Sequence, residues 1–182
     1  MLSSLPLDFT LLEFENASVK LIALKKIMRT EIVGLVIEEV EERHEFTVPF
    51  WVALILIESG MAKMSEGTLT NEEWTQIHFK ERFNPGGPLA QLPKDFYLRA
   101  YISISLAAKT VEGDPAKLEH LNRLNARFRE IVESRIGKVT RIAAAETSPQ
   151  PSSLQMEEDA LYHELDIIIS EWRIGIRKLV GK

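Results

Sequence analysis

The chain of 182 residues contains no cysteine. Disulfide bridges, cysteine nucleophiles and thiolate metal sites are therefore excluded. The first residues, Met1 to Asp8, have no basic segment and no hydrophobic run of signal-peptide length. The most hydrophobic stretch, residues 47–60, is shorter than the roughly 20 residues that a membrane-spanning helix needs. We therefore expect a cytoplasmic protein that does not enter a membrane.

Residues typical of metal and catalytic sites are few and scattered. No two of the four histidines lie four residues apart, as two ligands on one helix face would; they are His44, His78, His120 and His163. The sequence has no Gly-x-Ser-x-Gly motif, and Gly86-Gly87 lies between prolines rather than between a strand and a helix. We therefore expect no catalytic residue, no metal and no cofactor, and a protein that is not an enzyme.

Two kinds of sequence meet at residues 47–60. The segments 17–24 and 31–37 are short and rich in β-branched residues, which favours strands. Pro49 and Gly60 bracket a hydrophobic helix, and long amphipathic patterns follow it. The sequence predicts an α+β fold, mostly α: a small β-rich domain over residues 1–47, then a helical domain over residues 48–182. We expect Phe50, Trp51 and Leu54 to join the two domains or to pack the helical core.

Capping signals predict where the helices begin. Residues 9–15 can form a short leading helix, and Thr70 with Glu73 forms a capping box before a helix that ends near residue 82. Pro93 opens a helix over residues 94–104, and Asp114-Pro115 starts a long one that ends near residue 145. Ser153 can cap the last helix.

Charge is distributed unevenly along the chain, although the formal net charge is only −5. Residues 1–48 carry five basic and nine acidic side chains, and the acidic run 38–45 is interpreted as a solvated loop. The predicted helix after Pro115 carries seven basic and three acidic side chains, a balance of +4. This helix either binds nucleic acid or has a charged face that is solvated or contacts another subunit. The second interpretation is favoured because no aromatic residues interleave with the basic ones.

The positions of Arg135 and of the hydrophobic residues in the last helix both require partners when these residues are buried. Arg135 falls on the hydrophobic seam of its helix between Ile131 and Val139, so a carboxylate of this chain or of another must neutralise it. The last helix is apolar on more than one side and therefore needs neighbours on both, within the chain or from another subunit. The residues that we assign to a subunit interface are Leu165, Ile168, Trp172 and Ile176.

Four segments together resemble the GINS family of DNA replication proteins. The stretch 48–53, Val-Pro-Phe-Trp-Val-Ala, resembles the start of the GINS helical domain, and 92–97, Leu-Pro-Lys-Asp-Phe-Tyr, resembles the start of its next long helix. The stretch 135–139, Arg-Ile-Gly-Lys-Val, is similar to a basic element late in that domain, and 157–172 is similar to its final amphipathic helix. The β-rich part precedes the helical part, and this order is similar to that of the second and third partner-of-Sld-five subunits. The chain thus resembles an archaeal GINS subunit of this type.

The resemblance implies a non-catalytic scaffold at the replication fork. It implies a tetramer with a second GINS subunit type, two copies of each. The implied partners are the MCM helicase, a RecJ-like protein, and a primase or DNA polymerase, with weak or indirect DNA contact. The residues alone leave two alternatives open: a nucleic-acid-binding module built on the basic helix, and a generic helical oligomeric adaptor.

Overall fold

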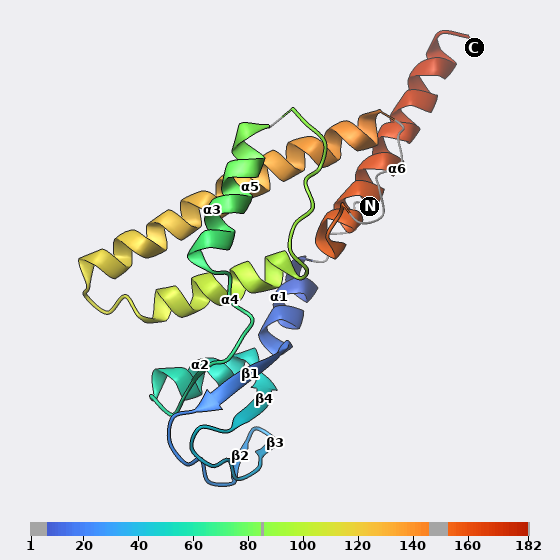
Figure 1. Cartoon of the computed structure of the whole chain (residues 1–182). Coiled ribbons are helices and arrows are strands. Elements are labelled where there is room, and N and C mark those ends of the chain that lie inside the picture. The colour runs from blue at the N-terminus through green and yellow to red at the C-terminus, as the bar shows by residue number, and fades with distance from the viewer. Residues whose placement is uncertain (1–6, 85, 146–152, 182) are drawn as a thin grey trace. The chain divides into compact units, whose positions relative to one another are not determined.

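The computed structural model describes residues 7–84, 86–145 and 153–181 (Figure 1). The predicted fold class is confirmed: the chain is α+β and mostly α, with a small sheet in its N-terminal region followed by a larger helical region. The elements, in chain order, are α1 Leu7–Asn16, β1 Ser18–Ala23, β2 Thr30–Ile32, β3 Leu35–Ile37, β4 Glu45–Pro49, α2 Phe50–Glu58, β5 Ala62–Met64, α3 Asn71–Phe83, α4 Phe96–Lys109, α5 Pro115–Ala144 and α6 Met156–Leu179.

A three-stranded antiparallel sheet, in the order β4-β1-β5, forms the β part of the chain. Side chains alternate between the two faces of a strand, and in β1 Val19, Leu21 and Ala23 are buried while Ser18 and Lys20 are exposed. The register places Val19 opposite Val48 of β4. The buried face of β1 is therefore continued by β4, and helix α2 packs against both strands (Figure 1).

Helix α2 is the hydrophobic helix predicted from residues 47–60. Pro49 occupies its N-cap position with a φ of −59°, a conformation that proline favours. Gly60 follows the helix with a φ of +67°, the left-handed conformation in which glycine commonly ends a helix. The buried residues of the helix are Phe50, Val52, Ala53 and Leu56.

Contacts divide the chain into two compact units that differ from the expected domains. Unit 1 comprises residues 1–69 and 98–121, and unit 2 comprises residues 70–97 and 122–182. The boundary expected between residues 47 and 48 falls inside unit 1, because α2 packs on the sheet. Phe50 is fully buried in the core of unit 1, and Trp51 and Leu54 are partly buried against the same core.

Unit 2 is helical and has an aromatic core. The ring of Trp74 in α3 lies edge-on to Phe96, at the start of α4, and to Phe128 in α5, with centroid separations of 6.2 and 6.5 Å. Tyr97 packs edge-on to Phe96 at 5.2 Å. The capping box predicted at the start of α3 is confirmed, because Thr70 Oγ1 accepts a hydrogen bond from the Glu73 amide and the Glu73 carboxylate accepts one from the Thr70 amide.

The segment 31–37 forms a hairpin rather than the single predicted strand. Val33 and Gly34 have φ values of 50° and 78°, so the chain reverses at these two residues. Strands β2 and β3 pair antiparallel on either side, with Ile32 opposite Leu35. The prediction was wrong because the β-branched Val33 favours an extended strand, yet it occupies a turn position that usually takes asparagine or glycine.

Two helices begin later than the capping signals predicted. Asp95 has a φ of 55°, which a helix does not accommodate, so α4 starts at Phe96 and not at residue 94. The N-cap of α6 is Gln155 rather than Ser153. The Glu158 carboxylate accepts a hydrogen bond from the Gln155 amide at 3.0 Å, as the third helical residue does in a capping box.

The acidic run 38–45 lies at the surface, where parts of it pair with basic residues. Lys26 Nζ lies 2.7 Å from Glu41, and Arg29 Nε lies 3.6 Å from Glu38. All four side chains are exposed, so these ion pairs add little to stability.

Candidate functional site

Arg135 lies at the centre of a buried ion network in unit 2. Its side chain is 1% exposed. The guanidinium donates two hydrogen bonds to Glu158, from Nε to Oε1 at 2.7 Å and from Nη2 to Oε2 at 2.5 Å. Nη1 also donates to the carbonyl of Ala90 at 2.7 Å, and Nη2 to the carbonyl of Ser153 at 2.8 Å. Glu158 is therefore the carboxylate that the seam position of Arg135 requires.

A second buried pair lies one turn further along α5. Lys138 Nζ donates to Glu81 Oε2 of α3 at 2.7 Å, and Ser134 Oγ donates to the same oxygen at 2.8 Å. Arg135 Nη1 lies 3.4 Å from the other oxygen of Glu81. Two cations thus face two carboxylates in an environment from which water is nearly absent, so the charges balance where an unpaired one would cost several kcal/mol.

Burial and Glu158 act in opposite directions on the Arg135 pKa. Burial lowers it, but the hydrogen bonds and the negative charge of Glu158 outweigh that effect and raise it above the ordinary value. The guanidinium therefore remains charged. The guanidinium donates hydrogen bonds to Glu158, to Glu81 and to two backbone carbonyls. The network therefore holds α3, α5, α6 and the segment around Ala90 together within unit 2.

Tyr97 joins the network through its hydroxyl, which donates to Glu158 Oε1 at 2.7 Å. Burial, followed by the charge of Glu158, raises the pKa of Tyr97 well above its ordinary value. The folded protein therefore holds this proton at a pH at which the unfolded chain releases it. The stability due to this difference is fully present below about pH 10 and is lost as the pH rises further.

Replacement of Tyr97 by phenylalanine should therefore reduce the alkaline sensitivity of the protein. We expect the wild-type free energy of unfolding to fall above about pH 10, and to fall less steeply in Tyr97→Phe, because the variant has no proton to release on unfolding. Urea unfolding at several alkaline pH values, together with titration of the tyrosinate absorption band, measures both effects. Tyr162→Phe, which removes a tyrosine outside the network, is the control; an equal change in both variants would contradict the prediction.

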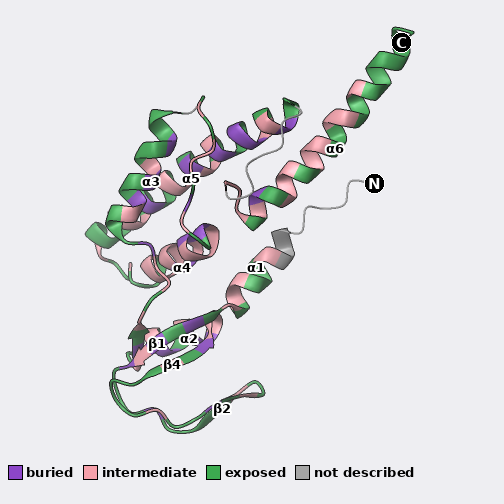
Figure 2. Cartoon of the chain, turned by 45° about the vertical axis from the view of Figure 1, so that its right-hand side comes forward, coloured by how far each residue is buried: buried purple, intermediate pink, exposed green. Residues whose placement is uncertain are grey.

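The second feature of unit 2 is an exposed hydrophobic face on α6. Of the four residues predicted to form a subunit interface, Leu165 is half-buried, whereas Ile168, Trp172 and Ile176 are exposed. The side chain of Trp172 is 66% exposed. Figure 2 shows that beyond its first turns α6 has exposed and intermediate residues only. We call Leu165, Ile168, Trp172 and Ile176 the α6 face.

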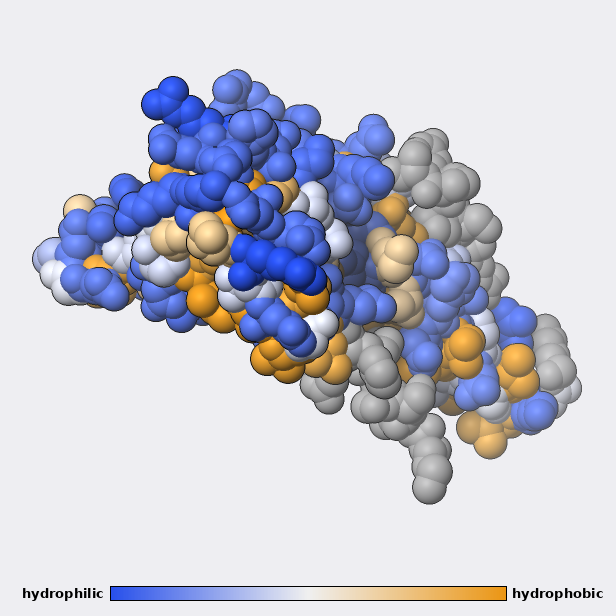
Figure 3. All heavy atoms as spheres, turned by 90° about the horizontal axis from the view of Figure 1, so that it is seen from below, coloured by the Kyte–Doolittle hydropathy of each residue, from blue (hydrophilic) through white to orange (hydrophobic). Residues whose placement is uncertain are grey.

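The α6 face leaves several large hydrophobic side chains exposed to solvent. Leu179 extends it, and other exposed hydrophobic side chains are seen among hydrophilic ones in Figure 3. Contiguous exposed patches larger than a few hundred Å² are uncommon on monomeric proteins and usually mark interaction sites. The α6 face is therefore the candidate functional site.

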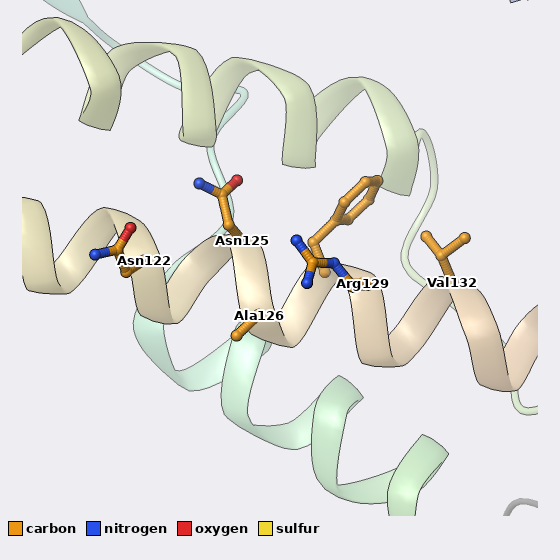
Figure 4. A pocket seen from close by; sticks show the side chains of 6 residues that line it. Asn122, Asn125, Ala126, Arg129 and Val132 are labelled. Atoms are coloured by element: carbon orange, nitrogen blue, oxygen red, sulfur yellow. The ribbon is translucent and has the colours of Figure 1, made fainter.

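A shallow hollow lies along α5, away from the buried network. Its volume is about 520 Å³, and Asn122, Asn125 and Arg129 line it together with Ala126 and Val132 (Figure 4). Its polar lining could accept hydrogen-bonding groups. Arg129 is the one basic side chain among the lining residues. Arg135 and Lys138 of the same helix are paired with Glu158 and Glu81 in the buried network.

The histidines are dispersed in the structure as in the sequence. His78 Nε2 lies 2.7 Å from Glu130 Oε2, which lowers the pKa of Glu130, and His163 Nε2 lies 3.5 Å from Asp159. Within residues 7–84, 86–145 and 153–181, no group of three or more histidine and acidic side chains is arranged to hold a metal ion. Over the same residues, no helix combines the length and hydrophobicity needed to span a bilayer.

Sequence reasoning did not identify Glu81, Lys138 and Tyr97 as members of the network. Glu81 follows Trp74 and Ile77 at helical spacing, so its position on the buried face of α3 was present in the pattern. Lys138 lies three residues after Arg135 and thus on the same side of α5. A charged residue in register with a hydrophobic seam is the signal that would have found both.

Comparison with known proteins gives no assignment. No model of a known protein family matches the chain, and no curated protein sequence matches it.

Proposed function

We propose that the chain is a non-catalytic interaction subunit of the DNA replication machinery, similar to an archaeal GINS subunit. The observation that carries the assembly role is the exposed α6 face, with Ile168 at 46% and Trp172 at 66% exposure. A surface of this kind is stabilised when a partner covers it. The replication role is supported by the resemblance of residues 48–53, 92–97, 135–139 and 157–172 to GINS segments.

In this proposal the chain forms a tetramer of two copies with two copies of a second GINS subunit type. The tetramer would work in the cytoplasm, at replication forks of the nucleoid. It would bind the MCM helicase, a RecJ-like protein, and a primase or DNA polymerase. Holding such partners together raises their effective concentration, and binding the active helicase conformation more tightly shifts its population toward that state.

The buried network supports the same role, because an interface needs rigid elements. Glu158 lies in the first turn of α6 and is bound by Arg135, Tyr97 and the Gln155 amide. These bonds fix the start of α6 on unit 2 and hence the direction in which the α6 face is presented. A face on a fixed helix loses less conformational entropy on binding than one on a mobile segment.

Ile168→Asp tests the assembly role. The charge would be buried without a partner in any complex that covers the α6 face, so we expect the variant to lose its partners and to have a monomeric mass of 20.7 kDa. Mass is measured by light scattering on the chain alone and on the chain co-purified with proteins from its source. Ile167→Asp is the matched control, because Ile167 is a neighbouring exposed isoleucine that points away from the α6 face.

Identification of the co-purified proteins tests the replication role separately. The expected partners are a second GINS type and the MCM helicase, both present with Ile167→Asp and both lost with Ile168→Asp. An unchanged mass for Ile168→Asp would overturn the assembly role. Co-purification of partners unrelated to replication would instead favour the alternative of a generic helical adaptor.

Nucleic-acid binding through α5 is the less favoured alternative. Arg135 and Lys138 account for two of the seven basic residues of α5, and both are buried and paired with carboxylates. They cannot contact phosphates. A filter-binding titration with single-stranded DNA, in which affinity fell steeply with salt, would favour the alternative over the proposal.

A further inference from the structure

We infer that the α6 face pairs with the α6 face of a second copy of this chain, with the two helices antiparallel. The inference rests on the proposed assembly role and specifies which surface meets the α6 face. The two-fold axis would pass near residues 173 and 174, so that each contact occurs twice. Three observations support this arrangement: the spacing of the hydrophobic residues, a glycine on the same face, and the order of charges along one flank.

Hydrophobic residues on α6 recur at intervals of four and three from Leu161 to Trp172, and the same spacing continued reaches Gly175 and Leu179. This spacing repeats every seven residues and forms the narrow seam along which two helices pack side by side. Leu161 and Leu165 are half-buried within unit 2, whereas the seam residues that follow are exposed. The seam positions are Leu161, Leu165, Ile168, Trp172, Gly175 and Leu179. Ile176 of the α6 face lies beside this seam, next to Gly175.

Gly175 occupies a seam position at which its own chain gives no reason for glycine. A Cβ atom added there would meet nothing within 4 Å, and glycine inside a helix costs about 1 kcal/mol relative to alanine. In an antiparallel pair centred at residues 173 and 174, Trp172 of each copy faces Gly175 of the other, and Ile168 faces Leu179. The indole fills the space that glycine leaves, so the largest and smallest seam residues are complementary.

The charges along one flank of the seam favour the antiparallel direction. Glu164, Glu171 and Lys178 follow one another at intervals of seven and therefore lie in a row beside the seam. Antiparallel pairing brings equivalent flanks together with their order reversed, so Glu171 of each copy lies beside Lys178 of the other. A parallel pair would instead place this flank against the opposite one, which carries Ile169 and Ile176 and no charge to match.

Gly175→Leu separates steric complementarity from general hydrophobic association. Leucine improves helix propensity and adds hydrophobic surface, so a non-specific association would strengthen. The proposed pairing predicts the reverse, because leucine occupies the space of Trp172 of the second copy. We expect the dissociation constant, measured by sedimentation equilibrium of the full chain, to rise at least about tenfold. Gly137→Leu on α5 is the matched control, since a Cβ at that helical glycine also meets nothing within 4 Å.

Charge reversal tests the direction of pairing. Glu171→Lys and Lys178→Glu should each raise the dissociation constant roughly tenfold, because two attractive pairs become repulsive, and the double variant should restore it. Asp166→Lys, on the opposite side of α6, is the control. Because the chain has no cysteine, single spin labels can be introduced at Ile174 and Met156. Antiparallel helices place the labels at 174 close together and those at 156 about 50 Å apart along the axis.

The outcomes distinguish this inference from the proposed function. Weaker association of Gly175→Leu, rescue by the double charge reversal and unequal spin-label distances support the antiparallel pair. Assembly that is lost with Ile168→Asp but insensitive to Gly175→Leu and to charge reversal overturns the inference and leaves the proposed function intact. Equal distances at both labels overturn the antiparallel direction. A chain that remains monomeric, alone and with proteins from its source, overturns both proposals.

Discussion

Arg135→Ala is expected to destabilise unit 2 by about 3–5 kcal/mol, the cost of breaking a buried ion pair from one side. Glu158, which is 4% exposed in the folded protein, would lose both hydrogen bonds from the guanidinium and keep those from the Tyr97 hydroxyl and the Gln155 amide. Glu81 keeps Lys138 and loses its second cation. Because a whole domain is stable by only about 5–15 kcal/mol, the loss is a large share of the total.

Urea unfolding followed by circular dichroism measures this effect. Arg129→Ala is the matched control, because Arg129 is an exposed residue of the same helix, and it should change the free energy of unfolding by less than about 0.5 kcal/mol. The paired replacement of Arg135 by methionine and Glu158 by leucine should recover most of the loss, since it leaves no unpaired buried charge and keeps the Lys138–Glu81 pair. A single variant no less stable than the Arg129→Ala control would contradict the structural role of the network.

Phe50→Ala is expected to have an effect of similar size on unit 1. The side chain is fully buried beneath the sheet and lies edge-on to Tyr101, with 5.7 Å between the ring centroids. Removing it takes away the burial of an aromatic ring and leaves a cavity, which together cost about 3–5 kcal/mol. The loss should be seen as faster amide hydrogen exchange in β1 and β4, the strands that α2 covers.

Ile55→Ala is the control for this prediction. Ile55 belongs to the same helix and is 49% exposed, so its truncation should cost much less. If the two variants had equal effects on hydrogen exchange in β1 and β4, Phe50 would not be the main contact between α2 and the sheet.

Elements with local start and stop signals were predictable from the sequence. The aspartate and proline at residues 114 and 115 and the seam that follows them gave the start of α5 at Pro115, and the Thr70 capping box gave the start of α3. The hairpin at Val33-Gly34 was missed, because a β-branched residue at positive φ contradicts its own propensity and is held there by the pairing of β2 with β3.

The candidate site was predictable only in part, for a related reason. The position of Arg135 on a hydrophobic seam indicated that it needs a carboxylate, but Glu81 lies 54 residues away in sequence and only the fold brings the two together. The sequence did not indicate that Glu158 is the carboxylate that binds Arg135, because an acidic residue in the first turn of a helix is already explained by the helix dipole. The exposure of Ile168 and Trp172 likewise follows from packing, which the helical pattern of α6 does not specify.

The division of the chain into units has a practical consequence for the design of fragments. Each unit is assembled from two separate stretches of sequence, and α4 contributes Phe96 and Tyr97 to unit 2 and Ile102 to the core of unit 1. No single cut can therefore release either unit intact. A truncation after residue 69 would remove Ile102 from beneath the sheet, so a shortened chain that fails in a binding assay would report misfolding rather than a lost contact. Point substitutions in the full-length protein are the safer way to map its surfaces.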